Sequence, residues 1–104
     1  MAISARGLVD DRSEPRDEVH HRTRGTRADG LPLELLIVNI SARGLMARCE
    51  APLKVGDRLR VKLPAVGGVP AEVRWSLGGR VGCQLDQSIP LASYFQLLAA
   101  MAKS

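Results

Sequence analysis

The stretch LPLELLIVNISARGLMARCE, Leu31 to Glu50, holds two apolar segments separated by a short polar break. LPLELLIVNI is an almost continuous run of Leu, Ile and Val, which is typical of a strand buried on both faces. SARG favours a turn, because Ser hydrogen-bonds its own backbone and Gly44 tolerates a positive φ. In LMARCE, alternation places Leu45, Ala47 and Cys49 on one face of a second strand. The stretch therefore predicts a strand, a turn and a return strand.

Segments on both sides of this stretch have the alternation of strands with one buried face. EVHHRTRGTR, residues 18–27, leads into Asp29-Gly30, a strong signal for a hairpin turn. After the turn residues APLKVGD, three more strands are expected in RLRVKL, VPAEVRW and RVGCQLD. The residues expected to point inward are Leu59, Val61 and Leu63 in the first strand and Val81, Cys83 and Leu85 in the third. In the second strand, Val69, Ala71, Val73 and Trp75 are expected to share one side.

The C-terminal segment has the spacing of a helix, and Pro90 suits its first turn. The apolar residues that recur at helical spacing are Leu91, Phe95, Leu98 and Met101 or Ala102. Six short strands and one terminal helix predict an all-β fold, a six-stranded antiparallel barrel with an α-helix packed on it. Residues 1–17 are charged and lack apolar periodicity, so we expect a flexible N-terminal arm there and the barrel with its helix in residues 18–104.

Composition and charge limit the function classes. With 104 residues the chain has the size of one domain, and one Trp, one Tyr and one Phe leave the core to aliphatic side chains. The net charge of +4 comes from residues 31–104, where nine Lys and Arg face five acids, whereas six Arg and six acids cancel in residues 1–30. Excess charge in the folded part favours a compact anionic ligand over a long polyanion held by a basic arm.

The sequence lacks the signals of a membrane protein, a secreted protein or an enzyme. No apolar run is long enough to span a membrane, and the charged N-terminal segment differs from a secretory signal. Cys49 and Cys83 lack metal-ligand spacing and are expected to be free buried thiols of a cytoplasmic protein. Adjacent His20 and His21 would point to opposite faces of a strand. We therefore expect no catalytic residue, no metal and no cofactor.

Two motifs remain as candidates for binding. RSEPR places Arg12 and Arg16 four residues apart, and NISARG runs from Asn39 to Gly44 at the end of the most apolar strand. Turn chemistry explains the residue types of NISARG, but not its position before a return strand. The hexapeptide ISARGL also occurs at residues 3–8, where neither Asn nor a predicted strand precedes it. We interpret that first copy as a coincidence.

The order of RxxxR, a hairpin, NxSxxG, GDRLRVKL, VRW and VGCQL resembles the PilZ domain, a bacterial receptor for cyclic di-GMP. The resemblance covers about residues 12–100, which is most of the chain. It implies a six-stranded barrel with a C-terminal helix, in agreement with the alternation of the strands. It also implies a non-catalytic receptor or adaptor with cyclic di-GMP as its ligand.

The resemblance assigns ligand contacts to residues of both motifs. The implied main contacts are Arg12, Arg16, Asn39, Ser41 and Gly44, and the candidate secondary contacts are Arg43, Arg74 and Trp75. Arg suits this ligand because a guanidinium can fork onto guanine O6 and N7, stack on a base or pair with a phosphate. Asn39 takes the place of an Asp found in many members. Asp11 stands where an Arg would favour a stacked ligand dimer, so we expect one ligand per chain.

We expect the ligand to pin residues 1–17 against the barrel, so that a downstream protein partner reads the newly ordered surface. Two alternatives stay open. One is a degenerate PilZ-like module that binds only another protein, and the other is a small basic barrel that binds nucleic acid, which the pI of 9.7 suggests. The scarcity of aromatic residues argues against nucleic acid, so no DNA partner is expected. We expect a monomer whose helix packs on its own barrel.

Overall fold

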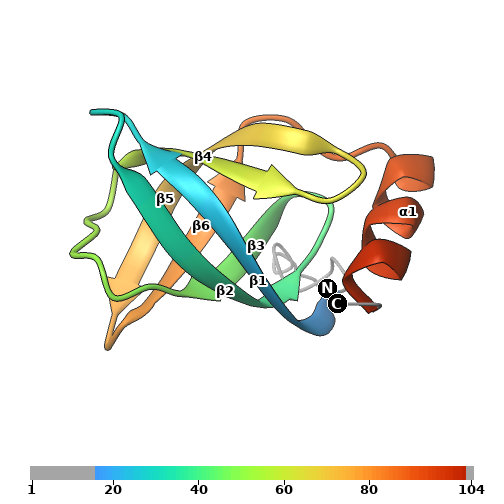
Figure 1. The fold of residues 1–104 in the computed structure, drawn as a ribbon, viewed down its shortest axis with the longest axis horizontal. Helices are drawn as coiled ribbons and strands as arrows, with labels where there is room; N and C mark the ends of the chain where they lie inside the picture. The colour runs from blue at the N-terminus through green and yellow to red at the C-terminus, as the bar shows by residue number, and fades with distance from the viewer. Residues whose placement is uncertain (1–15, 103–104) are drawn as a thin grey trace, which may run out of the picture.

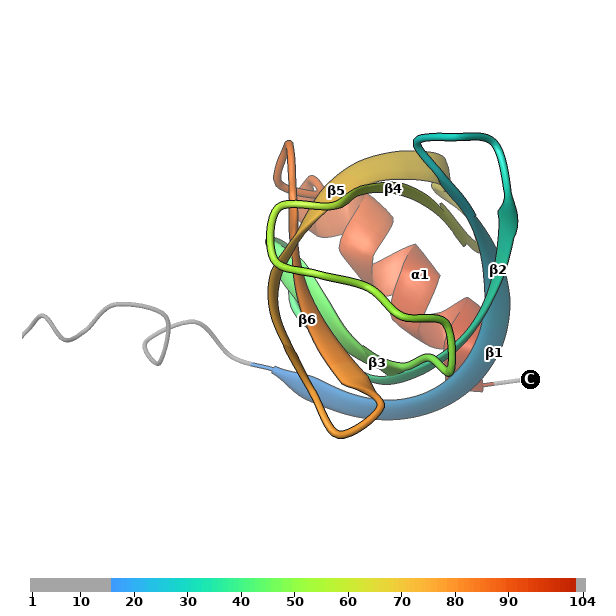
Figure 2. The same cartoon turned by 90° about the vertical axis from the view of Figure 1, so that its left-hand side faces the viewer.

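The computed structural model describes residues 16–102, which form six β-strands and one α-helix (Figure 1). In chain order they are β1 (Asp17–Arg27), β2 (Pro32–Ile40), β3 (Gly44–Arg48), β4 (Arg58–Leu63), β5 (Gly67–Leu77), β6 (Arg80–Leu85) and α1 (Leu91–Ala102). Neighbouring strands are antiparallel, and the order β1-β2-β3-β6-β5-β4 closes into a ring through β4 and β1 (Figure 2). The predicted antiparallel barrel with a C-terminal helix is confirmed.

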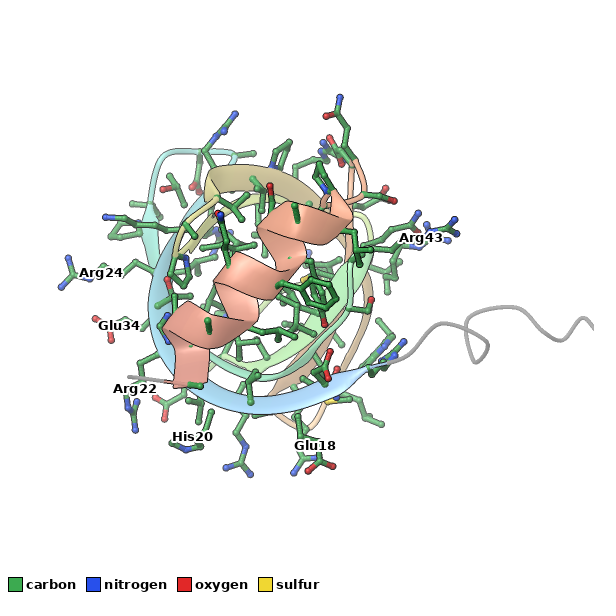
Figure 3. The ribbon with its side chains drawn as sticks, turned by 90° about the vertical axis from the view of Figure 1, so that its right-hand side faces the viewer. Glu18, His20, Arg22, Arg24, Glu34 and Arg43 are labelled. Atoms are coloured by element: carbon green, nitrogen blue, oxygen red, sulfur yellow. The ribbon has the colours of Figure 1, made fainter. Side chains whose placement is uncertain are left out.

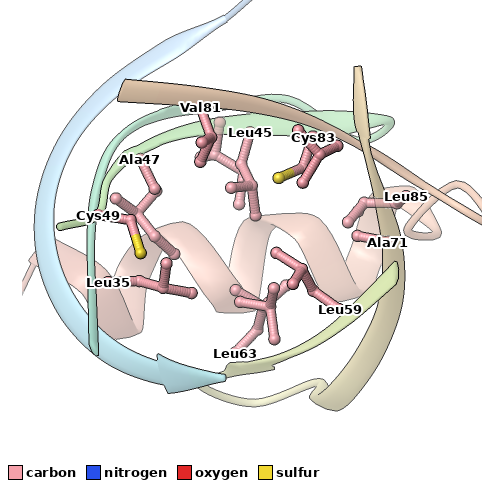
Figure 4. Packing of buried hydrophobic residues seen from close by; sticks show 14 of the residues in the cluster. Leu35, Leu45, Ala47, Cys49, Leu59, Leu63, Ala71, Val81, Cys83 and Leu85 are labelled. Carbon is pink, nitrogen blue, oxygen red and sulfur yellow. The ribbon is translucent and has the colours of Figure 1, made fainter. Parts of the chain in front are cut away.

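Alternate residues of the strands fill the inside of the barrel (Figure 4). In β4 the inward residues are Leu59, Val61 and Leu63, and in β6 they are Val81, Cys83 and Leu85, all as predicted. Leu45, Ala47 and Cys49, in and directly after β3, are also buried as predicted. Burying one such aliphatic side chain contributes about 1.5–3 kcal/mol. The alternation therefore closes the barrel around an apolar core.

Strand β2 differs from its prediction, because only one of its faces is fully buried. Leu33, Leu35 and Ile37 are buried, whereas Glu34 is exposed and Leu36 is half-buried. The wall of this barrel is a single sheet, so the outer face of each strand meets solvent unless another element covers it. The apolar residues of the outer face raise the hydrophobicity of β2 without being part of the core.

Strand β5 contains a bulge that reverses the prediction for Trp75. Val73 pairs with Cys83 and Trp75 pairs with Gly82, so Arg74 is an extra residue without a partner in β6. The extra residue shifts the alternation, and the indole of Trp75 lies on the outer face with 40% of its surface exposed. The expectation that Trp75 lies on the same side of the strand as Val73 is therefore wrong.

Helix α1 covers one end of the barrel (Figures 1 and 2). The residues that it buries are Tyr94, Leu97 and Met101, whereas Leu91 and Phe95 are 68% and 60% exposed. The predicted helix is confirmed; of the apolar residues predicted at helical spacing, Met101 is buried and Leu98 packs against the core, whereas Leu91 and Phe95 lie on the exposed side. Because α1 carries apolar residues on nearly every side, spacing alone did not select the face. No helix within residues 16–102 has the length and apolar character needed to cross a membrane.

Candidate ligand-binding site

Arg16, the last residue of RxxxR, comes next to NISARG where strand β1 begins. β1 and β2 pair with Asp17 opposite Ile40. Arg16 directly precedes β1, and its side chain is exposed. The register therefore places Arg16 beside the start of NISARG, although 23 residues separate it from Asn39 along the chain. Arg12, the other arginine of RxxxR, lies outside the described residues, as do the first ISARGL copy and most of the predicted arm.

Ser41 holds the turn between β2 and β3. Its backbone N–H donates to the carbonyl oxygen of Gly44 at 2.8 Å. Its Oγ lies 3.2 Å from the backbone nitrogens of Arg43 and Gly44, and accepts from both. The side chain is only 5% exposed. Ser41 therefore shapes the turn through its hydroxyl group, and a ligand would benefit from the shape of the turn.

Gly44 is required by close packing of the backbone. A Cβ atom at this position would lie 2.6 Å from the carbonyl oxygen of Cys83 in the neighbouring strand β6. Gly44 is not among the glycines with positive φ in the described chain, so the prediction that it supplies a positive φ is wrong. The small residue instead lets β3 and β6 approach directly after the turn.

Asn39 faces the outside of the barrel beside this turn and is half-buried. Its Nδ2 lies 3.8 Å from Sδ of Met46, which is a weak acceptor. Its Oδ1 is buried and has no hydrogen-bond donor. An unsatisfied buried acceptor costs about 1–3 kcal/mol. The side chain of Asn39 therefore keeps an unused hydrogen-bond acceptor beside the turn.

An apolar surface continues from Asn39 across the outer face of three strands. The strand register aligns Asn39 with Met46, Met46 with Gly82, and Gly82 with Trp75. Gly82 has space for no side chain, because a Cβ atom there would lie 2.0 Å from Nε1 of Trp75. The indole thus lies directly on the backbone of Gly82, beside Met46. This surface is suited to stacking of a planar base.

Cationic side chains border the turn and this surface. Arg43, within the turn, is exposed and points away from the barrel (Figure 3). Arg74 donates from Nη1 to Oε1 of Gln84 at 2.7 Å, and Gln84 pairs with Gly44. A surface hollow beyond them is lined by Arg58, Glu72, Arg74, Gln84, Leu85 and Asp86. Within it Arg58 is paired with two carboxylates, which leaves Arg74 better placed to meet an anion.

Tyr94 connects α1 to both motif segments, and sequence analysis did not single it out. Its hydroxyl oxygen lies 2.6 Å from Oδ2 of Asp17 and 2.9 Å from the carbonyl oxygen of Ile40. Asp17 follows Arg16, and Ile40 follows Asn39. The sequence signal that could have identified it is the i, i+3, i+7 spacing of Tyr94, Leu97 and Met101.

Within residues 16–102, no group of three His, Cys, Asp or Glu side chains is arranged to hold a metal ion. A protein-family model described as the PilZ domain matches residues 10–103. The match includes the RxxxR segment, all six strands and α1. A search of curated proteins finds no match.

Proposed function

Because the chain belongs to the PilZ domain family, a family of non-catalytic receptors for cyclic di-GMP, we propose that it binds this dinucleotide and passes the signal to a protein partner. Membership identifies the class of ligand for the family. Binding by this chain, and the coupling to a partner, are the parts that we propose. The single observation that supports them best is the pairing of Asp17 with Ile40, which brings Arg16 to the NISARG turn.

In the proposed complex, the arginines of the first motif meet the phosphates and guanine edges of the ligand. Arg12 and Arg16 would each form charge-assisted hydrogen bonds, worth about 1.5–3 kcal/mol per bond. Arg43 and Arg74 stand around the same surface and would add positive charge. Their role is secondary, because neither is brought to the Asn39 side chain by the strand register.

The outer surface of the barrel would receive one guanine. Oδ1 of Asn39 lacks a donor, and a guanine Watson–Crick edge offers N–H groups. Trp75 and Met46 would stack on the base, while Ser41 and Gly44 keep the turn in its observed shape. This division of roles gives Ser41 and Gly44 a supporting function and Asn39 a direct one.

Coupling to the partner would use residues 1–17. We propose that ligand capture by Arg12 and Arg16 orders this segment against the barrel and thereby creates a new surface. Asp17 lies at the junction and is already linked to α1 through Tyr94. The position of α1 would therefore sense the geometry of the segment that holds the ligand.

Isothermal titration calorimetry with cyclic di-GMP tests the binding proposal. We expect the double variant Arg12→Ala/Arg16→Ala to lose at least a hundredfold in affinity, since each arginine is worth about tenfold or more. The matched control is Arg22→Ala/Arg24→Ala, which removes two arginines from the outer face of β1 away from the site. This control should bind as the parent protein does. Equal affinities of the two double variants would refute the assignment of the site.

A further inference from the structure

Four cationic side chains lie together on the outer face of β1 and β4. Arg22 and Arg24 alternate along β1, and Arg60 and Lys62 alternate along β4, all exposed. The two strands pair with Thr26 opposite Arg60, so the antiparallel register carries Arg24 towards Lys62. Oγ1 of Thr23 donates to the carbonyl oxygen of Lys62 at 2.5 Å, which holds the strands together at this point. We call these four residues the β1–β4 cationic patch.

The patch cations are not neutralised, and they outnumber the exposed pair Arg48 and Arg80, which also lacks a carboxylate partner in the described chain. On the same strand β4, Arg58 is paired with Glu72 and Asp86, and at the end of β1, Arg27 lies 3.7 Å from Asp29. In the described chain, none of the four patch side chains lies within ion-pair distance of a carboxylate. Like charges on adjacent strands destabilise a sheet. This grouping of cations therefore lowers the stability of the barrel, so a role in folding does not account for it.

Most of the excess charge of the barrel is located here. Residues 16–102 contain twelve Lys and Arg and eight Asp and Glu, and the four patch cations are accompanied by one acid, Glu34, opposite Arg24. The patch is also remote from the ligand site. In the ring of strands, β1 and β4 are opposite β3 and β6, and Figure 3 shows Arg24 and Arg43 on opposite sides of the barrel.

We propose that the β1–β4 cationic patch is a docking surface for an acidic surface of a partner protein. Glu34 distinguishes a protein from a nucleic acid, because a carboxylate inside the patch repels a phosphate chain but can pair with a basic residue of a protein. The residues paired with Arg60 and Lys62 in the neighbouring strands are Thr26, Pro70 and Gly68. These residues offer no aromatic ring on which a base could stack. Because the patch and the ligand site lie on opposite sides of the barrel, the chain can hold the ligand and the acidic partner protein at the same time. This role goes beyond ligand binding.

The test uses the full chain and a fluorescein-labelled decaglutamate peptide as a stand-in for the acidic surface. Fluorescence anisotropy at about 0.15 M ionic strength measures affinity, and NMR shifts of the labelled protein locate binding. The patch variant is Arg22→Glu/Lys62→Glu, and the partners of these residues in β2 and β5, Leu36 and Gly68, are uncharged. The matched control is Arg48→Glu/Arg80→Glu, an exposed pair across β3 and β6 with the same change of net charge.

We expect the peptide to shift the NMR signals of residues in β1 and β4. The affinity for the peptide should be about tenfold lower in the patch variant and less than about threefold lower in the control variant. Cyclic di-GMP binding of the patch variant should stay unchanged, which separates this inference from the proposed function. If the charge-reversed protein does not fold, the neutral variant Arg22→Gln/Lys62→Gln should still lower the affinity for the peptide about threefold. No peptide binding, equal losses in patch and control variants, or tighter binding of a twenty-base-pair DNA duplex at the patch would each overturn the proposal.

Discussion

Replacing Gly44 with Ala tests whether close packing of β3 on β6 builds the binding turn. The added Cβ would stand 2.6 Å from the carbonyl oxygen of Cys83, whereas ordinary contacts begin at 3.4 Å. The strands must separate, which weakens the adjacent bond from the N–H of Leu85 to the carbonyl oxygen of Arg43, now 2.8 Å. Overpacking costs about 1–3 kcal/mol and a weakened hydrogen bond about 0.5–1.5 kcal/mol.

A smaller opposing effect comes from the unfolded chain, because Ala has less conformational freedom than Gly and favours folding by about 0.4–1 kcal/mol. We therefore expect Gly44→Ala to lower the free energy of unfolding by about 2 kcal/mol. For a domain of this size, that lowers Tm by about 8–16 °C. Thermal and urea unfolding, followed by far-UV circular dichroism, measure both quantities.

Gly68→Ala is the matched control, since it is also a strand glycine without a positive φ. The added Cβ would meet only the flexible side chain of Arg60, at 3.3 Å. We expect its stability to stay within about 0.5 kcal/mol of the parent protein. If Gly44→Ala were as stable as Gly68→Ala, the packing argument for the turn would be refuted.

Three further predictions concern other parts of the chain. Tyr94→Phe should lower stability by about 1–2 kcal/mol in urea unfolding, because the hydroxyl no longer reaches Asp17, and an unchanged midpoint would contradict this. Burial raises the pKa of the Cys83 thiol from 9.0 to about 11, so its contribution to stability is present below pH 9 and is lost as pH rises towards 11. Cys83→Ala should flatten that decline between pH 8 and 10.5, and an equally steep decline would refute the assignment. Asp11→Arg should raise cyclic di-GMP affinity and the calorimetric stoichiometry from one towards two ligands per chain, whereas no change would count against the role given to Asp11.

The barrel could be predicted from the sequence. In segments such as RLRVKL, charged and apolar residues alternate, and a β-strand places all of the apolar residues on one buried face. The prediction from sequence failed where a single extra residue in a strand changes which side chains point inward. At Arg74 the bulge moves Trp75 outside, and no local signal marks the bulge. In α1 apolar residues surround the helix, so the buried face depends on contacts with the barrel rather than on spacing.

The candidate site was predictable as two motifs, but not as a geometry. The meeting of Arg16 with the NISARG turn depends on the pairing of β1 with β2, which follows from the register and not from distance along the chain. The reason for Gly44 is the position of Cys83 in a strand 39 residues later. Tyr94 was missed because its two hydrogen-bond partners lie in other elements.

The most direct test of the account is an NMR titration of the full chain with cyclic di-GMP. The account predicts the largest shifts at Arg12, Arg16, the turn 39–44 and the indole N–H of Trp75, with little change at the β1–β4 cationic patch. Such a result would show that the two motifs and the outer surface form one site. Absence of binding, or shifts concentrated away from both motifs, would contradict the claim that the register of β1 and β2 assembles a cyclic di-GMP site.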